Sequence, residues 1–188
     1  MTEGQTIISE PTMKSEASDA AESQASGTRV PAPTWARLIS TFFGAGRIQP
    51  GPGTWGSLSA ILVWAIASKV VAPRWQPETL GVLILIAVII GIPAATRMCR
   101  ATGIKDPQFI VIDEVAGQWL TLLLAPLTWK TAAVGFILFR GFDIVKPPPV
   151  RQLEKLPEGT GIVADDLAAG AFGLAILQVL LHFGLLRS

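Results

Sequence analysis

Seven charged residues lie near the ends of apolar segments and combine acids with bases. They form two acidic pairs and one Arg-x-x-Asp-x-x-Lys triplet: Asp113, Glu114, Arg140, Asp143, Lys146, Asp165 and Asp166. Carboxylate oxygens suit a hard cation, and Mg²⁺ binds through a few carboxylates, several waters and phosphate oxygens. Arginine offers a planar fork to phosphate, and lysine offers a compact charge. We predict that the five acids are catalytic Mg²⁺ ligands and that Arg140 and Lys146 hold a phosphate.

Each of these groups also has a purely structural interpretation. Carboxylates near a helix N-terminus are favoured by the helix dipole, which would account for Asp113 and Glu114. Aspartate is a favoured N-cap, so Asp165 or Asp166 could cap the last helix while the other binds metal. The Arg140 triplet has helical i, i+3 spacing and could be a surface ladder of ion pairs.

A glycine-rich stretch at residues 44–57 precedes the first apolar segment. It holds five glycines and two prolines, which predicts a loop up to Ser57. Glycine lets backbone N–H groups approach an anion at a helix start, so Gly44, Gly46, Gly53 and Thr54 are candidate phosphate-binding residues. A simple turn explains the glycines equally well. Gly117 and Gly170 are expected instead to pack helices closely.

The single cysteine and the single histidine exclude several kinds of chemistry. Cys99 cannot form an internal disulfide, and the sequence after it lacks the C-x5-R spacing of cysteine phosphatases. His182 lies deep in the last apolar run. A Ser-His-Asp triad or a pair of histidines therefore has little support.

The composition predicts an integral membrane protein. Half of the 188 residues are hydrophobic and 15% are charged, whereas an ordinary soluble domain has about 25% charged residues. Apolar segments occur at residues 57–71, 80–95, 110–127, 131–139 and 167–186, the fourth extending through Asp143 or beyond. We expect an all-α, multihelical fold with about four to five short membrane segments.

The N-terminal region differs in composition from the rest of the chain. Residues 1–33 are rich in Ser, Ala, Glu, Thr and Gly and predict a disordered tail, with no hydrophobic stretch typical of a signal peptide. Residues 34–188 are expected to form a single membrane-embedded domain. Within it, residues 35–43 predict a short helix, either at the membrane surface or in the core.

The basic residues predict how the chain is oriented. With a cytoplasmic N-terminus and five membrane segments, eleven of the fifteen Lys and Arg residues fall on the cytoplasmic side, as the positive-inside rule requires. The glycine-rich stretch and all seven charged site residues fall on that side too. Because these residues share one side, we predict that they form one site. A metal together with Arg140 and Lys146 at a membrane face implies phosphoryl chemistry on a lipid. Attack by water and attack by a carboxylate both remain open.

Four motifs resemble the phosphatidylglycerophosphatase A family of bacterial membrane lipid phosphatases. They are GAGRIQPGPGTWGSL (44–58), IDEVAG (112–117), FRGFDIVKPPPVRQLE (139–154) and GTGIVADDLAAG (159–170), and the resemblance covers residues 38–186. Their order and spacing look like the family's. Arg47 stands where an uncharged residue is expected, and Gly141 where a bulkier one is usual.

The resemblance implies Mg²⁺-dependent hydrolysis of the terminal phosphate of phosphatidylglycerophosphate to phosphatidylglycerol, in phospholipid biosynthesis. It places the chain in the bacterial inner membrane as a multi-pass protein whose active site faces the cytoplasm. The expected partners are this phospholipid and the lipid bilayer, without nucleic acid and without an obligate protein partner. Two other readings are a lipid phosphotransferase, which should show a longer aspartate-rich motif, and a small transporter, which should carry charge near the bilayer midplane.

Overall fold

The structure is a computed structural model that describes residues 31–186. These residues belong to one compact unit. They form helices only, without any strand in this range: α2 (Thr34–Ser40), η1 (Ala45–Arg47), α3 (Pro52–Val70), η2 (Pro73–Trp75), α4 (Gln76–Thr102), α5 (Ile112–Leu122), α6 (Trp129–Val145), α7 (Val150–Leu153) and α8 (Glu158–His182). The all-α class is therefore confirmed. The tail predicted for residues 1–33 lies outside the described residues except for 31–33.

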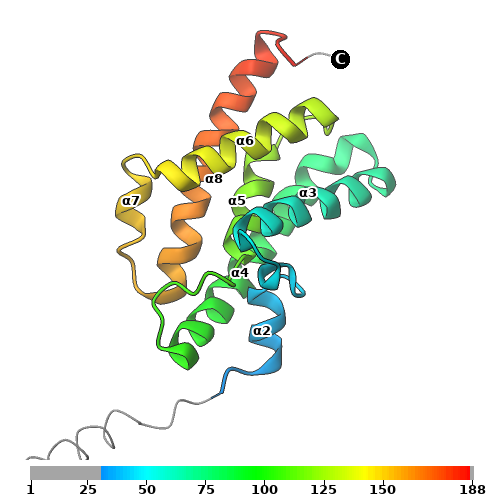
Figure 1. Ribbon diagram of the computed structural model, residues 1–188. Helices are drawn as coiled ribbons and strands as arrows, with labels where there is room; N and C mark the ends of the chain where they lie inside the picture. Colours follow the sequence, from blue (N-terminus) through cyan, green and yellow to red (C-terminus); the bar gives the residue numbers. More distant parts are fainter. Residues whose placement is uncertain (1–30, 187–188) are drawn as a thin grey trace, which may run out of the picture. The chain divides into compact units, whose positions relative to one another are not determined.

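The helix α5 lies at the centre of the fold. It contacts α3, α4, α6 and α8, which surround it in Figure 1. Nine of its eleven residues are buried, including Val115, Ala116 and Trp119. The indole N–H of Trp119 donates a hydrogen bond to the Ala60 carbonyl of α3 at 2.8 Å. A polar link inside an apolar core fixes how the two helices rotate relative to each other.

Close backbone contact between α5 and α8 brings the two acidic pairs together. A Cβ on Gly170 would lie 2.5 Å from the Gly117 carbonyl, and a Cβ on Gly117 would lie 2.6 Å from the Asp166 carbonyl. The Thr121 hydroxyl reaches the carbonyls of Gly117 and Gly170, at 3.0 and 3.2 Å. The packing role predicted for Gly117 and Gly170 is confirmed, because only glycine permits this approach.

Two predicted loop boundaries are wrong. The helix α3 begins at Pro52, inside the stretch expected to be a loop up to Ser57. Proline is favoured at the first helical position, and Gly51 takes the left-handed conformation just before it, with φ of 72°. The helix α8 begins at Glu158, two turns before the acidic pair. Asp165 and Asp166 are therefore interior helix residues, and the N-cap interpretation of this pair is wrong.

Fewer helices than expected are long and apolar enough to cross a membrane. Within the described residues, only Pro73–Thr102 and Glu158–His182 are long and apolar enough to cross a membrane, against the four to five predicted. The helices α5 and α6 have 11 and 17 residues, and a helix rises about 1.5 Å per residue, so α5 spans only about 16 Å. The periodicity of apolar residues did not reveal this shortness.

The helices alternate in direction, so all the motif-bearing ends lie together. The chain reverses direction between α3 and α4, between α4 and α5, and between α5 and α6. At the end remote from the motifs, the α3–α4 and α5–α6 connections lie side by side, because Pro73, Gln76, Leu124 and Pro126 line one pocket. The start of α3, the end of α4, the start of α5 and the end of α6 therefore meet at the opposite end.

Candidate active site

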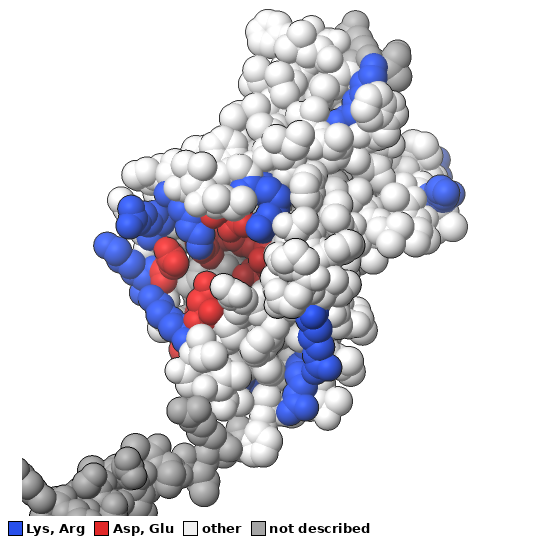
Figure 2. All heavy atoms as spheres, in the orientation of Figure 1, with Lys and Arg blue, Asp and Glu red and all other residues white. Residues whose placement is uncertain are grey.

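One cavity at the motif-bearing end collects residues from all four motifs. Its volume is about 470 Å³, and Gly53, Asp113, Arg140 and Asp165 each contribute to its wall. Figure 2 shows the carboxylates gathered in one hollow that Lys and Arg border, on a face that is otherwise mostly uncharged. The predicted convergence of these motifs on one site is confirmed.

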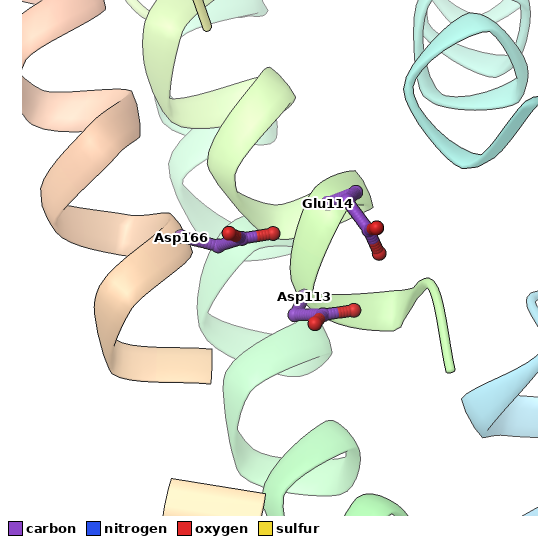
Figure 3. Close-up of side chains that lie close together, drawn as sticks. All are labelled: Asp113, Glu114 and Asp166. Atoms are coloured by element: carbon purple, nitrogen blue, oxygen red, sulfur yellow. The ribbon is translucent and has the colours of Figure 1, made fainter. Parts of the chain in front are cut away.

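Two buried carboxylates and one mostly buried carboxylate form the floor of the cavity. Asp166 reaches from α8 toward Asp113 and Glu114 at the start of α5 (Figure 3). One oxygen from each residue lies within 4.8 Å of an oxygen from each of the others. Asp113 and Asp166 are 7% and 4% exposed. Because like charges this close repel strongly where water is scarce, the cluster needs a positive partner.

The unpartnered oxygens of this cluster fit a bound cation. Asp113 Oδ1, Glu114 Oε2 and Asp166 Oδ2 are buried, and none has a hydrogen-bond partner. Buried polar atoms are normally paired, so three orphaned oxygens in one place indicate a missing ligand. An all-oxygen donor set suits Mg²⁺. The residues present therefore fit the metal that the sequence predicts.

Arg140 stands beside the cluster and is held by two acids. Its Nη1 lies 2.5 Å from Asp143 Oδ2 within α6 and 3.9 Å from Glu114 Oε1 on α5. All three side chains are mostly buried, with exposures of 13–18%. Two carboxylates on one guanidinium restrict its rotation and leave the other N–H groups of the fork available for an anion.

Lys146 is held by the neighbouring helix rather than by its own. Its Nζ donates to Asp165 Oδ2 at 2.7 Å and lies 3.7 Å from Glu154. Burial lowers the pKa of Lys146, but the hydrogen bond to Asp165 and the nearby acids raise it more, so the pKa lies above its ordinary value. Of the ion-pair ladder considered as an alternative, only the Arg140–Asp143 pair is present, because Lys146 is paired with Asp165 of α8.

The five predicted metal ligands divide into two groups. Asp113, Glu114 and Asp166 form the cluster, whereas Asp143 and Asp165 each hold one cation at its edge. The sequence could not separate these groups, because the pairing depends on contacts between α5, α6 and α8. Direct ligation by Asp143 or Asp165 stays a prediction.

The glycine-rich stretch reaches the cavity through its middle part, Gln49 and Gly51–Gly53. Gly53 lines the wall, whereas Gly44, Gly46 and Thr54 are absent from it. A Cβ on Gly46 would overlap the Phe109 carbonyl, so this glycine allows close packing against the segment before α5. A Cβ on Gly53 would overlap Glu114 Oε1 and lie 2.9 Å from Arg140 Nη1. Gly53 therefore lets the start of α3 touch the acidic floor.

Several wall residues were not anticipated from the sequence. The connection between α4 and α5 supplies Lys105, Asp106 and Gln108, and the segment before α3 supplies Gln49. Glu154 and Glu158 complete the outer wall. One signal was present in the sequence: GIKDPQ is a polar interruption directly before the FIVIDEV stretch, on the same predicted side of the membrane.

Acidic residues outnumber basic residues around the cavity. Three cations face eight carboxylates: Lys105, Arg140 and Lys146 against Asp106, Asp113, Glu114, Asp143, Glu154, Glu158, Asp165 and Asp166. A phosphate dianion would be repelled by such a wall unless another positive charge were present. The charge balance therefore points to a metal, as the orphaned oxygens do.

Comparisons with known proteins give the same assignment. The family model for phosphatidylglycerophosphatase A matches residues 38–181. Phosphatidylglycerophosphatase A of Escherichia coli K12 is 34% identical over 147 residues, covering 77% of this chain and 83% of that protein. The Haemophilus influenzae Rd protein of the same name is 34% identical over 146 residues, covering 74% and 85%. A putative phosphatidylinositol-3-phosphatase of Bacteroides thetaiotaomicron is 39% identical over 150 residues, covering 76% and 91%.

No solved structure matches the chain significantly. The family match nevertheless spans all the helices that form the cavity, from α3 to most of α8. The cavity residues and the comparisons agree on an enzyme that removes phosphate. The chain belongs to the phosphatidylglycerophosphatase A family.

Proposed function

We propose that the chain hydrolyses the terminal phosphomonoester of phosphatidylglycerophosphate. Water adds to phosphorus, the bond from phosphorus to the glycerol oxygen breaks, and that oxygen gains a proton. The products are phosphatidylglycerol and inorganic phosphate. The observation that carries the proposal is the floor of three carboxylates, each with a buried oxygen that has no hydrogen-bond partner, beside Arg140 in a chain of this family.

Mg²⁺ is the proposed cofactor, held by Asp113, Glu114 and Asp166. When bound, Mg²⁺ supplies positive charge that stabilises the developing charge on the phosphate oxygens and activates water. The residues themselves give the reason for choosing it: three carboxylates within 4.8 Å and no histidine or thiolate in the cavity wall. Hard oxygen ligands of this kind favour Mg²⁺ over softer metals.

The proposed phosphate contacts come from two helices. Arg140, fixed by Asp143 and Glu114, presents its guanidinium at the level of the floor. The first turn of α3 begins at Pro52, and backbone N–H groups in the first turn of a helix have no partner within that helix. The backbone N–H of Gly53 is such a donor at the cavity wall, and helix N-termini favour anions. Lys146 adds charge at the edge and keeps Asp165 in place.

Phosphate release from phosphatidylglycerophosphate tests the proposal directly. We expect purified protein in detergent micelles to release phosphate, EDTA to stop the release, and Mg²⁺ to restore it. Phosphatidylinositol 3-phosphate should be assayed in parallel, because one relative is named for that lipid. Release from that lipid alone would contradict the proposed substrate. Release unaffected by EDTA would contradict the proposed metal dependence.

We further propose that the protein is a multi-pass protein of the bacterial inner membrane whose cavity faces the cytoplasm. Exposed apolar side chains lie along the outer helices, as Leu62 in α3 and Ile89 in α4 show at 61% each. Such surfaces indicate contact with lipid. At the end remote from the cavity, Arg74 lies over Trp75 and Lys130 over Trp129. Exposed tryptophans with neighbouring cations are typical of a membrane–water interface.

Cysteine labelling in intact cells checks this orientation. A membrane-impermeant maleimide should label Arg74→Cys but not Lys155→Cys, because Lys155 is exposed at the cavity end. After the membrane is permeabilised, both should react. Native Cys99 is buried and serves as the unlabelled background. Labelling of Lys155→Cys alone in intact cells would reverse the proposed orientation.

A further inference from the structure

The cavity has two levels that differ in burial and in composition. Its floor is the buried carboxylate cluster with Arg140 beside it. Its mouth contains exposed side chains from two connections: Gln49 before α3, and Lys105, Asp106 and Gln108 between α4 and α5. The proposed chemistry uses the floor, the start of α3 and Lys146, and none of these mouth residues. The mouth residues are therefore free to act on another part of the substrate.

Lys105 differs from the other two cations of the cavity. Arg140 and Lys146 are each paired with carboxylates of the protein. Lys105 lines the cavity and, within the described residues, has no carboxylate within 4.0 Å of its ammonium. The neighbouring Asp106 attracts this ammonium at a longer range than an ion pair. Lys105, at the mouth of a predominantly acidic cavity, is therefore available for an anionic group of the substrate.

The backbone around Lys105 is held in place. The helix α4 ends at Thr102 and is capped by Gly103, whose φ of 71° turns the chain toward the cavity. The Cys99 thiol then donates to the Lys105 carbonyl at 3.2 Å. Because the backbone is fixed, the ammonium of Lys105 can move only a limited distance from the mouth. A lysine that only faces solvent would not need such a fixed backbone.

We propose that Lys105, with the amides of Gln49 and Gln108, binds the phosphodiester of the substrate headgroup. This inference rests on the proposed function, because it concerns a lipid that carries a diester and a terminal monoester. When the monoester occupies the floor, the rest of the lipid leaves the cavity through the mouth. The diester, which lies several bonds nearer the diacylglycerol, is then nearer the mouth. Lys105 is thus a specificity-determining residue that selects headgroups with two phosphates.

Two probes separate the levels of the cavity. The product phosphatidylglycerol carries the diester without the monoester, and inorganic phosphate resembles the monoester alone. Both can be used as inhibitors of the full-length protein in detergent micelles. In Lys105→Ala, we expect the KM for phosphatidylglycerophosphate and the inhibition constant of phosphatidylglycerol to rise about fivefold to tenfold, as loss of a recognition charge at a rim allows. The inhibition constant of phosphate and kcat should stay within about twofold.

Matched variants test whether position or mere charge matters. Lys155→Ala removes the same charge from an exposed site outside the cavity wall and should change neither constant. Lys105→Arg should retain most of the affinity for phosphatidylglycerol. High salt should reduce the difference between the wild type and Lys105→Ala, because exposed charges are screened.

Three results would overturn the inference. The first is Lys105→Ala with an unchanged inhibition constant for phosphatidylglycerol. The second is an equal rise for phosphatidylglycerol and inorganic phosphate, which would place Lys105 at the monoester. The third is an equal effect of Lys155→Ala, which would indicate general attraction to an anionic surface. Each of these leaves the proposed function intact if the wild type is active, whereas an inactive wild type would remove the proposed function itself.

Discussion

Asp166→Asn should abolish phosphate release while the protein stays folded. The amide has nearly the same shape as the carboxylate, but it removes one negative ligand from the group formed with Asp113 and Glu114. Changes in residues that merely support metal ligands usually cost about 10- to 100-fold, so loss of a ligand should cost at least about 100-fold. Phosphate release over a Mg²⁺ titration measures the effect, and the thermal unfolding midpoint reports on folding.

Stability gives a second readout of the same change. Asp166 is 4% exposed and its Oδ2 has no partner, so in the absence of metal the carboxylate is a destabilising charge. We expect Asp166→Asn to unfold at a higher temperature than the wild type in EDTA, and to gain less stability when Mg²⁺ is added. Glu78→Gln, the same change at an exposed residue in the first turn of α4, is the control. Normal turnover of Asp166→Asn at low Mg²⁺ would refute the three-carboxylate site.

Gly53→Ala should inactivate the enzyme although it adds only one methyl group. The new Cβ would overlap Glu114 Oε1 and lie 2.9 Å from Arg140 Nη1. Either these side chains move or the start of α3 moves away from the floor. A displacement of about 1 Å in a catalytic arrangement can cost about 100-fold in rate. We expect kcat/KM for phosphatidylglycerophosphate to fall by about that factor, measured by phosphate release.

Two other glycines control for the effect of a methyl group on the helices. Neither Gly81 in α4 nor Gly141 in α6 has a neighbour within 4 Å of an added Cβ. Alanine is favoured over glycine inside a helix by about 0.5–1 kcal/mol, so both variants should be active and slightly more stable. Full activity in Gly53→Ala would show that α3 does not touch the floor as described. Equal loss in Gly141→Ala would show that any added methyl is harmful.

The type and order of the residues predicted the composition of the site better than they predicted the details of the fold. Acids and bases at the ends of apolar segments, combined with alternating helix direction, were enough to bring Asp113, Arg140 and Asp166 into one cavity. They could not give the pairing of Lys146 with Asp165, because this contact depends on where α6 and α8 cross. Lys105 and Gln108 were not predicted as site residues either, because a short polar connection resembles any solvent-facing loop.

The predicted helix boundaries were wrong where close backbone contacts, rather than hydropathy, determine where a helix begins. The start of α8 was expected near Leu167, because GTGIVADD contains two acids and two glycines. The helix instead begins at Glu158, where Gly159 and Gly161 permit close contacts with the carbonyls of Ile92 and Leu156. Apolar periodicity predicts which residues are buried, but it does not predict close backbone contacts. The number of candidate membrane-crossing helices was overestimated for a similar reason. Residues of α5 are apolar because protein buries them, although the helix itself is short.

In the proposed membrane arrangement, the shortness of α5 has a consequence for how the chain would enter a bilayer during synthesis. With 11 residues and an acidic first turn, α5 cannot hold a transmembrane position alone. The guanidinium that compensates Glu114 is made 26 residues later, and the third carboxylate of the cluster, Asp166, another 26 residues later. In the proposed multi-pass arrangement, α5 and α6 would therefore insert as a hairpin, and the proposed catalytic floor would close only when α8 docks against Gly117.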